Sequence, residues 1–203
     1  MSVRPGASRA ASVSAVVLAA VLALAGCATG TNGGMGHDGH ATGGAEAAAD
    51  ANAADVMFAQ MMIPHHEQAI EMSELILAKE GVDPEVMELA EQIEAAQGPE
   101  IEQMQTWLDE WGAPSMMDAD DMAGMGGMDG MLTEEQLDEL AAADGATGSA
   151  LFLEGMIEHH EGAIDMAEQH QENGENEEAL ELSASIIETQ TAEIERMREL
   201  LAG

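Results

Sequence analysis

The chain has 203 residues, of which 40 are Asp or Glu and only 5 are Lys or Arg, so its formal net charge is −35. Such an acidic surface makes nucleic acid and anionic lipid headgroups poor partners. The single cysteine excludes an internal disulfide, and a packed core must hold the fold together.

The N-terminal residues have the pattern of a bacterial secretory leader. Arg4 and Arg9 precede an apolar run over residues 15–25, which is much shorter than the roughly 20 residues of a membrane-spanning helix. The run ends in Leu-Ala-Gly-Cys27, which resembles the cleavage box of bacterial lipoproteins. This resemblance implies a signal peptide over residues 1–26 and a lipid on the Cys27 sulfur, which anchors the protein at the extracytoplasmic face of the cell membrane.

The next segment predicts a tether followed by a helical hairpin. Residues 27–52 are rich in Gly, Ala, Thr and Asn, which is typical of a flexible, disordered linker. Helical periodicity then extends over residues 53–79 and stops at Gly81. An Asp-Pro pair follows, as an N-cap with proline at the first helical position, and predicts a second helix over residues 84–111. The first hairpin therefore covers residues 53–111.

A methionine-rich linker, residues 112–147, separates this hairpin from the rest of the chain. Its first part combines Met with Gly and Asp without an apolar period, so it predicts a loop. The loop methionines either capture a soft metal ion or belong to an inert linker. Thr133 and Gln136 then form a capping-box pattern, which predicts a short helix that Gly145 ends. The loop methionines are Met116, Met117, Met122, Met125, Met128 and Met131.

A second helical hairpin is predicted over residues 148–203, with helices over 148–171 and 177–201. It repeats the first one: the segment from Met62 to Met72 returns from Met156 to Met166 with eight of eleven positions identical. Each hairpin has one apolar face to bury, so two facing hairpins predict an all-α four-helix bundle. The side chains that recur on the second helix of each hairpin are Gln97, Glu100 and Met104, matched by Gln190, Glu193 and Met197.

Two adjacent histidines occupy the same place in each copy. At about 100° per residue, His65 and His66 flank the small Ala69 on the buried face, while Glu67 points away from it. Paired inward histidines that occur twice favour metal ligands over ordinary buried histidines. His170, near a helix end, is expected instead to cap the helix or to face solvent. The second copy of the pair is His159 and His160, around Ala163.

Polar side chains on the partner helices face the same interior. Gln97 lies in the middle of its apolar stripe and Glu100 at the edge, and Gln190 and Glu193 repeat this arrangement. An unpaired buried polar group costs about 1–3 kcal/mol. We therefore expect the four side chains to bond to the histidine nitrogens and fix the ring orientation, or to be occasional direct ligands.

Methionines recur at matched positions around the histidines. Met62 and Met72 flank the first pair on its own helix, and Met156 and Met166 flank the second. Their thioethers are candidate ligands, but methionine at helical spacing is commonly core filler, so both interpretations stay open. Met104 and Met197 are expected beside the site on the partner helices.

The repeated Met-Ile-x-His-His-Glu-x-Ala-Ile-x-Met motif, the downstream Gln-x-x-Glu-Ile-x-x-Met and the Met-Gly-rich linker resemble the DUF305 family of secreted bacterial proteins. The similarity covers about residues 53–201. That family is placed in the ferritin-like superfamily, and some of its members are associated with periplasmic copper binding and tolerance. The resemblance implies the same paired-hairpin fold here. It matches His65, His66, His159 and His160 to the histidine motif, and Met62, Met72, Met156 and Met166 to its flanking methionines.

Ligand chemistry also favours copper. Imidazole and thioether groups without thiolate suit Cu(I) or Cu(II) better than structural zinc, and silver binds the same groups. We therefore expect an extracytoplasmic, lipid-anchored protein that sequesters copper, a binding protein rather than an enzyme. The acidic surface does not by itself establish metal binding, because it also serves solubility or salt adaptation.

Alternatives from other classes remain at this point. A di-iron oxidoreductase on a ferritin-like bundle needs Glu-x-x-His on two helices and a further Glu on each of the others. No Glu-x-x-His occurs in this sequence, and Glu100 and Glu193 would supply only two carboxylates. A non-catalytic interaction module, in which the histidines form a structural hydrogen-bond network, is the other alternative. A homodimer, in which a second bundle completes a half-site, also stays open.

Overall fold

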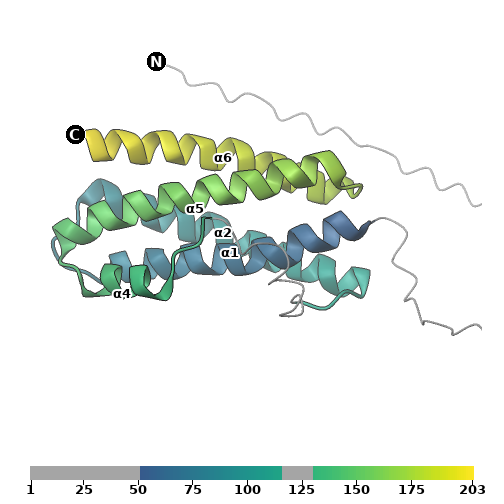
Figure 1. The fold of residues 1–203 in the computed structure, drawn as a ribbon, viewed down its shortest axis with the longest axis horizontal. Helices are drawn as coiled ribbons and strands as arrows, with labels where there is room; N and C mark the ends of the chain where they lie inside the picture. The colour runs from purple at the N-terminus through teal and green to yellow at the C-terminus, as the bar shows by residue number, and fades with distance from the viewer. Residues whose placement is uncertain (1–50, 116–129) are drawn as a thin grey trace, which may run out of the picture. The chain divides into compact units, whose positions relative to one another are not determined.

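The computed structural model describes residues 51–115 and 130–203, which form helices and short connections without any strand (Figure 1). The expected leader, Cys27 and nearly all of the tether lie outside the described residues, as do the loop methionines except Met131. None of the helices in these two ranges is both long enough and apolar enough to cross a lipid bilayer.

Helix α1 spans Ala53–Leu77 and begins at the residue where the helical period begins. The Asn52 side chain accepts the backbone N–H groups of Ala54 and Asp55 at 2.7 and 3.1 Å, and the Asp55 carboxylate accepts the Asn52 N–H at 2.6 Å. This capping box satisfies amides that have no partner within the helix. The helix continues through Pro64.

Helix α2 spans Pro84–Trp111, with its first residue as the sequence predicts. The Asp83 side chain accepts the Glu85 N–H at 2.8 Å, and proline fits the first turn because its missing N–H would have had no helical partner. The helix ends at Gly112, whose φ of 65° is the left-handed conformation that favours glycine.

Helix α4 spans Glu134–Ala142 and has the predicted capping box. The Thr133 hydroxyl accepts the Gln136 N–H at 3.3 Å, and the Gln136 side-chain oxygen accepts the Thr133 N–H at 2.9 Å. The helix packs against α1 and α5, the first helix of the second hairpin. The linker is therefore tied to both hairpins at its C-terminal end.

Helix α5 spans Gly145–Asn173 and starts earlier than the sequence predicts. Gly145 was expected to end the short helix, but it is the first residue of α5, because Asp144 caps the helix by accepting the Thr147 N–H at 2.8 Å. A Cβ on Gly145 would lie 2.6 Å from the Val82 nitrogen. Glycine is therefore needed for close contact with the α1–α2 turn, a role that short-range sequence patterns do not reveal.

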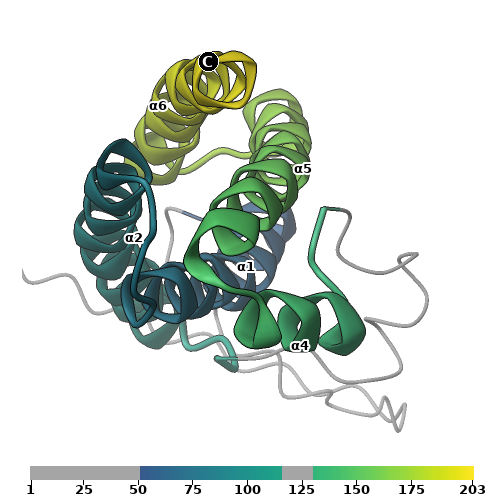
Figure 2. The same ribbon diagram turned by 90° about the vertical axis from the view of Figure 1, so that its left-hand side faces the viewer.

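The second hairpin is completed by α6, which spans Glu177–Ala202. Its N-cap is Asn176, whose side-chain oxygen accepts the Ala179 N–H at 2.9 Å. Within the hairpins α1 packs on α2 and α5 packs on α6, and the two hairpins meet mainly through α1 and α5. Figure 2 shows these four long helices around a common interior, with α4 beside α1 and α5. The predicted all-α four-helix bundle of two hairpins is confirmed.

The two copies of the motif differ where the linker crosses them. Gln68 of the first copy holds the Leu132 backbone from both sides, accepting its N–H at 2.7 Å and donating to its carbonyl at 2.9 Å. The matching residue of the second copy is Gly162, and a Cβ on the adjacent Gly130 would lie 3.0 Å from the Gly162 Cα. The two copies therefore differ at this position because the single linker contacts each of them in a different way: it bonds to the Gln68 side chain in one and packs on the Gly162 backbone in the other.

The bundle interior consists of two apolar clusters with polar residues between them. One cluster includes Met72, Ile93, Phe152 and Met197, and the other includes Phe58, Met104, Ala163 and Ile186. On every long helix, the repeated histidine, glutamine or glutamate positions fall between residues of the two clusters. We call this set the polar layer; its members are His65, His66, Gln97, Glu100, His159, His160, Gln190 and Glu193.

Candidate functional site

The polar layer is buried to an extent that is unusual for ionisable groups. His65, His66 and His160 expose none of their surface and His159 exposes 1 %. Gln97 and Gln190 are buried as well. Burying polar groups is unfavourable unless hydrogen bonds or a bound ion compensate for the lost water. The hydrogen bonds of each nitrogen and oxygen in the layer therefore indicate whether it is a structural hydrogen-bond network or a site for a cation.

Each hairpin contains one histidine–carboxylate pair with the same geometry. His66 Nε2 lies 2.8 Å from Glu100 Oε2 in the first hairpin, and His160 Nε2 lies 2.7 Å from Glu193 Oε2 in the second. A carboxylate accepts a hydrogen bond from the Nε2–H group, and in a neutral ring with its proton on Nε2 the Nδ1 atom carries a free lone pair. The glutamates thereby set which nitrogen of each ring is available to a cation.

Those two Nδ1 atoms have no hydrogen-bond partner among the described residues. The same is true of the side-chain oxygens of Gln97 and Gln190, which were expected to bond to the histidines. Most buried polar atoms in folded proteins are paired. Because these four are lone-pair donors, they fit a cation better than they fit a completed structural hydrogen-bond network.

The two histidine pairs meet across the hairpin interface. The ring centroids of His65 on α1 and His159 on α5 are 3.7 Å apart, with the ring planes inclined by 41°. Burial lowers the pKa of His159 well below its ordinary value, and the three other layer histidines lower it further because like charges oppose protonation. The His159 ring is therefore neutral at physiological pH, as a metal ligand must be.

The predicted methionine ligands divide into two groups. Met62 and Met156 are fully buried and lie three residues before the central histidines, about one helical turn away. Met72 lies seven residues after His65, about 10 Å along the helix axis, and its methyl group packs near Gly155. Met104 and Met197, the expected neighbours on the partner helices, are also fully buried.

Met166 lies away from the polar layer, in a separate environment. It is half-buried and lines a pocket together with Met57 and Met61 of α1. Met57 and Met61 are not among the residues that the sequence pattern predicts as ligands, because they fall outside the buried stripe of α1. Their spacing of four residues, which puts them on one side of a helix, was the available signal.

A ready-made cluster of three or more histidine, cysteine or carboxylate ligands is not found in the two described ranges. The carboxylates of Glu100 and Glu193 are instead engaged with histidines. The carboxylate-rich ligand set of a di-iron centre therefore has no counterpart in this part of the chain.

His170 corrects the expectation that it caps a helix or faces solvent. It is 3 % exposed, its Nε2 lies 2.9 Å from Asp55 Oδ1, and its Nδ1 lies 3.0 Å from Ser183 Oγ. Its ring also stacks on Phe58 with centroids 4.2 Å apart. The position lies eleven residues after His159, close to three helical turns, so the helical period itself placed it on the buried face. We call Asp55, His170 and Ser183 the buried clasp.

The clasp has the residue types of a hydrolase triad but not its environment. Ser183 exposes none of its surface, and its hydroxyl donates to the Leu180 carbonyl at 3.1 Å. The Asp55 carboxylate also accepts the backbone N–H groups of Glu175 and Asn176, each at 3.1 Å. A nucleophilic serine must reach a substrate. These contacts instead fasten the start of α1 to the α5–α6 connection.

Comparisons with known proteins agree with the fold. The model of the family described as "Domain of unknown function (DUF305)" matches residues 55–201. A DUF305 protein from Streptomyces coelicolor is 36 % identical, with a TM-score of 0.69, over 73 % of this chain and 92 % of that one. A DUF305 fragment from Deinococcus radiodurans is 28 % identical, with a TM-score of 0.65, over 75 % and 98 %.

A third solved structure is of CopM in a Cu(I)-bound form. It is 33 % identical to this chain, with a TM-score of 0.60, and the match covers 72 % of this chain and 94 % of CopM. Further CopM structures that match are Cu(II)-bound, Ag-bound and apo forms. No curated protein matches the sequence.

Proposed function

Because this chain belongs to the DUF305 family, we propose that it is an extracytoplasmic metal-binding protein that sequesters copper, or silver, in the polar layer. The observation that carries the proposal is the pair of buried Nδ1 atoms on His66 and His160. Each lacks a hydrogen-bond partner among the described residues, while a glutamate fixes the opposite nitrogen of the same ring. Copper-bound forms of the similar CopM support the choice of metal.

The histidine–glutamate pairs match the usual support of metal-binding imidazoles. Such a ring commonly gives its other N–H to a carboxylate, which orients the ring and raises its basicity. In this protein Glu100 and Glu193 supply that carboxylate from α2 and α6. The ligands would be Nδ1 of His66 and His160, in the layer that the ring contact of His65 and His159 joins across the hairpin interface.

Buried thioethers complete the donor set. Met62 and Met156 lie one helical turn from the central histidines, in a site without a thiolate. Imidazole with thioether is a soft set that suits Cu(I) and Ag(I) and accommodates Cu(II). Full burial restricts water and substrates, which favours holding an ion over catalysis at the ion. Sequestration therefore fits the geometry better than an enzymatic role.

The location follows from the leader. The Leu-Ala-Gly-Cys27 box would place a lipid on Cys27, so the bundle would work on the extracytoplasmic face of the membrane, joined to it by residues 27–52. Cys27 is the single cysteine of the chain. If its sulfur carries the lipid, no thiol of this chain competes with the bundle for copper.

A copper titration with paired variants tests the proposal. We expect His66→Leu combined with His160→Leu to lower Cu(I) affinity by at least tenfold in anaerobic competition against a chromophoric chelator, because two ligands are lost. Glu67→Gln is the matched control, since Glu67 belongs to the same motif but is exposed. The proposal would be wrong if the His66→Leu and His160→Leu double variant bound copper with unchanged stoichiometry and affinity. The same result for His65→Ala combined with His159→Ala would also contradict it.

A further inference from the structure

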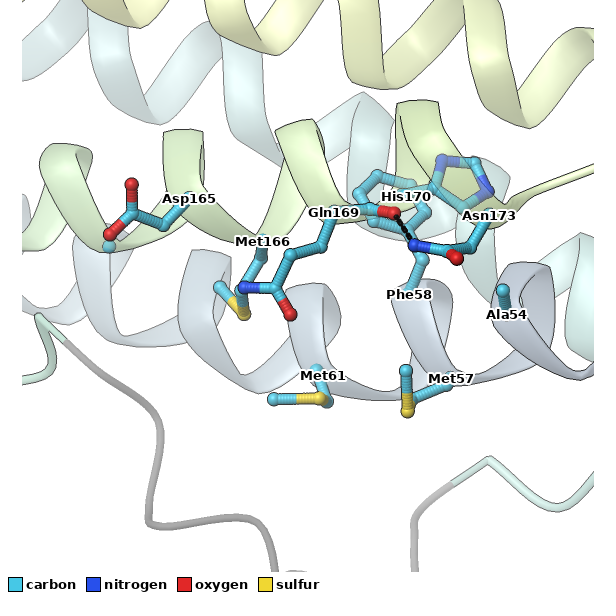
Figure 3. Close-up of a pocket in the computed structure, with 10 residues that line it drawn as sticks. Ala54, Met57, Phe58, Met61, Asp165, Met166, Gln169, His170 and Asn173 are labelled. Atoms are coloured by element: carbon cyan, nitrogen blue, oxygen red, sulfur yellow. Dashed lines mark hydrogen bonds between the residues drawn. The ribbon is translucent and has the colours of Figure 1, made fainter.

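A second candidate site lies outside the polar layer, between α1 and α5. A pocket of about 170 Å³ opens there, and its lining includes three methionines: Met57 and Met61 from α1 and Met166 from α5 (Figure 3). No member of the polar layer lines it. Asp165, Gln169 and Asn173 of α5 supply most of its polar lining.

These three methionines differ from those of the bundle core. Each is half-buried, whereas Met62, Met72, Met104, Met156 and Met197 are fully buried. Core filling therefore accounts fully for the second group and only in part for the first, in which Met166 packs at the margin of the cluster that contains Phe58. In Figure 3 the side chains of Met57, Met61 and Met166 lie on the same side of the contact between α1 and α5, facing the viewer. A flexible side chain with three rotatable bonds allows such thioethers to converge without movement of the backbone.

The other donors near the pocket narrow the choice of ligand. The His170 ring lines the pocket, but its two nitrogens are engaged by Asp55 and Ser183. Asn173 Nδ2 donates to the Gln169 backbone carbonyl at 2.7 Å. The remaining donors are the three thioethers and the side-chain oxygens of Asp165, Gln169 and Asn173. Among these donors the thioethers select soft ions over Zn²⁺, Mg²⁺ or Ca²⁺.

Charge around the pocket favours a cation. The pocket lining contains no Lys or Arg and includes the exposed carboxylate of Asp165. In the described ranges the basic side chains are engaged elsewhere: Lys79 donates to backbone carbonyls, and Arg196 and Arg198 pair with glutamates. The negative charge of the protein therefore favours a cation at this pocket. The neutral sulfur atoms in the lining favour a soft cation.

We propose that this pocket is a second, separate site for a soft monovalent ion, Cu(I) or Ag(I), held by the thioethers of Met57, Met61 and Met166. The site does not depend on the polar layer for ligands. It lies on the same two helices as His65 and His159, and Met61 comes one helical turn before His65. One of the three proposed ligands therefore lies one helical turn from the polar layer, although no histidine of that layer lines the pocket.

Silver titration of the protein with leucine variants tests the second site. Leucine keeps the volume of methionine but has no sulfur, so Met57→Leu combined with Met61→Leu should preserve the fold. In chloride-free buffer we expect calorimetry to show about one equivalent of Ag(I) fewer than in the wild type. Met87→Leu is the matched control, because Met87 is also half-buried but lies on α2, away from the pocket.

Methionine methyl resonances give a site-specific readout. In protein labelled with ¹³C at the methionine methyl groups, Ag(I) should shift Met57, Met61 and Met166 and leave Met87 in place. These shifts should persist in the His66→Leu and His160→Leu double variant, which separates this site from the proposed copper layer. The second site is overturned if the three resonances stay unmoved, or if Met57→Leu with Met61→Leu binds as much Ag(I) as the wild type.

Discussion

The imidazole rings of His65 and His159 are in contact, with centroids 3.7 Å apart, although 94 residues of sequence separate them. This contact joins α1 of one hairpin to α5 of the other and brings the duplicated His-His pairs into one layer. In the proposed copper site, the two half-sites would supply ligands from both hairpins. In the metal-free protein this contact opposes protonation of His159, because burial and the neighbouring histidines lower its pKa.

His159→Leu should make the metal-free protein less sensitive to acid. The folded-state pKa of His159 is lowered, whereas an unfolded histidine titrates near 6.5. Below about pH 6.5 the unfolded wild type therefore binds a proton that the folded protein does not, and folding stability falls by up to about 1.4 kcal/mol per pH unit. Urea unfolding at pH 7.5 and 5.5 measures the free energy of unfolding of both proteins. Relative to the wild type, the variant should be more stable at pH 5.5 than at pH 7.5. An equal difference at both values would contradict this.

Glu193→Gln should weaken copper binding more than it weakens the fold. The carboxylate accepts from His160 Nε2 and is only 22 % exposed, so its loss removes the group that orients the ring. Comparable changes beside metal ligands lower affinity by roughly 10–100-fold. Competition titration with Cu(I) measures the effect, and Glu188→Gln, on the exposed side of α6, is the control. Equal affinity for both variants would argue against the orienting role.

Asp55→Asn should destabilise the protein at neutral pH and much less in acid. Burial raises the pKa of Asp55, but hydrogen bonds from Asn52, His170 and the α5–α6 connection outweigh it and lower the pKa from the ordinary 3.8. The stability that the carboxylate contributes is therefore complete above about pH 4 and is lost as pH falls through the lower folded-state pKa. We expect a loss of about 1–3 kcal/mol at pH 7, because a charged hydrogen-bond acceptor is removed.

Thermal unfolding at pH 7 and at pH 3 checks this prediction about the clasp. The difference between wild type and Asp55→Asn should be smaller at the lower pH. The exposed Asp109→Asn serves as the control for general charge effects, which are large in a protein with 40 acidic residues. A difference that grows in acid would show that the carboxylate does not stabilise the native state.

Two glycines near the start of α5 should respond oppositely to alanine. In Gly145→Ala the new Cβ would lie 2.6 Å from the Val82 nitrogen, and a clash with backbone should destabilise the protein by about 1–3 kcal/mol. In Gly148→Ala the nearest atoms, both at 3.2 Å, are side-chain atoms, Cδ1 of Ile76 and Cδ of Lys79, and a shift of a few tenths of an ångström relieves the contact. That variant should gain part of the roughly 1 kcal/mol of helix propensity that separates alanine from glycine. Urea unfolding compares the two, and a stable Gly145→Ala protein would contradict the close approach.

The helices follow from local interactions, and local interactions are legible in the sequence. The helical period, the Asp83-Pro84 pair and the Thr133 capping box predict where α1, α2 and α4 begin. They do not predict the start of α5, which begins at Gly145. The same period places the histidine pairs inside the bundle. The internal repeat adds the two-hairpin architecture, because a duplicated hairpin with one apolar face needs a partner face to bury it.

The partners of those buried groups depend on how the hairpins pack. Whether His66 bonds to Glu100 rather than to Gln97 depends on the tilt and register of two helices, which side-chain periodicity does not encode. The pairing of His170 with Asp55 and the Gly145 contact join residues that are distant in sequence, so no local propensity signals them. The amino-acid sequence therefore specifies which groups enter the core. Tertiary packing decides which of them bond to each other and which atoms, such as Nδ1 of His66 and of His160, are left without a hydrogen-bond partner among the described residues.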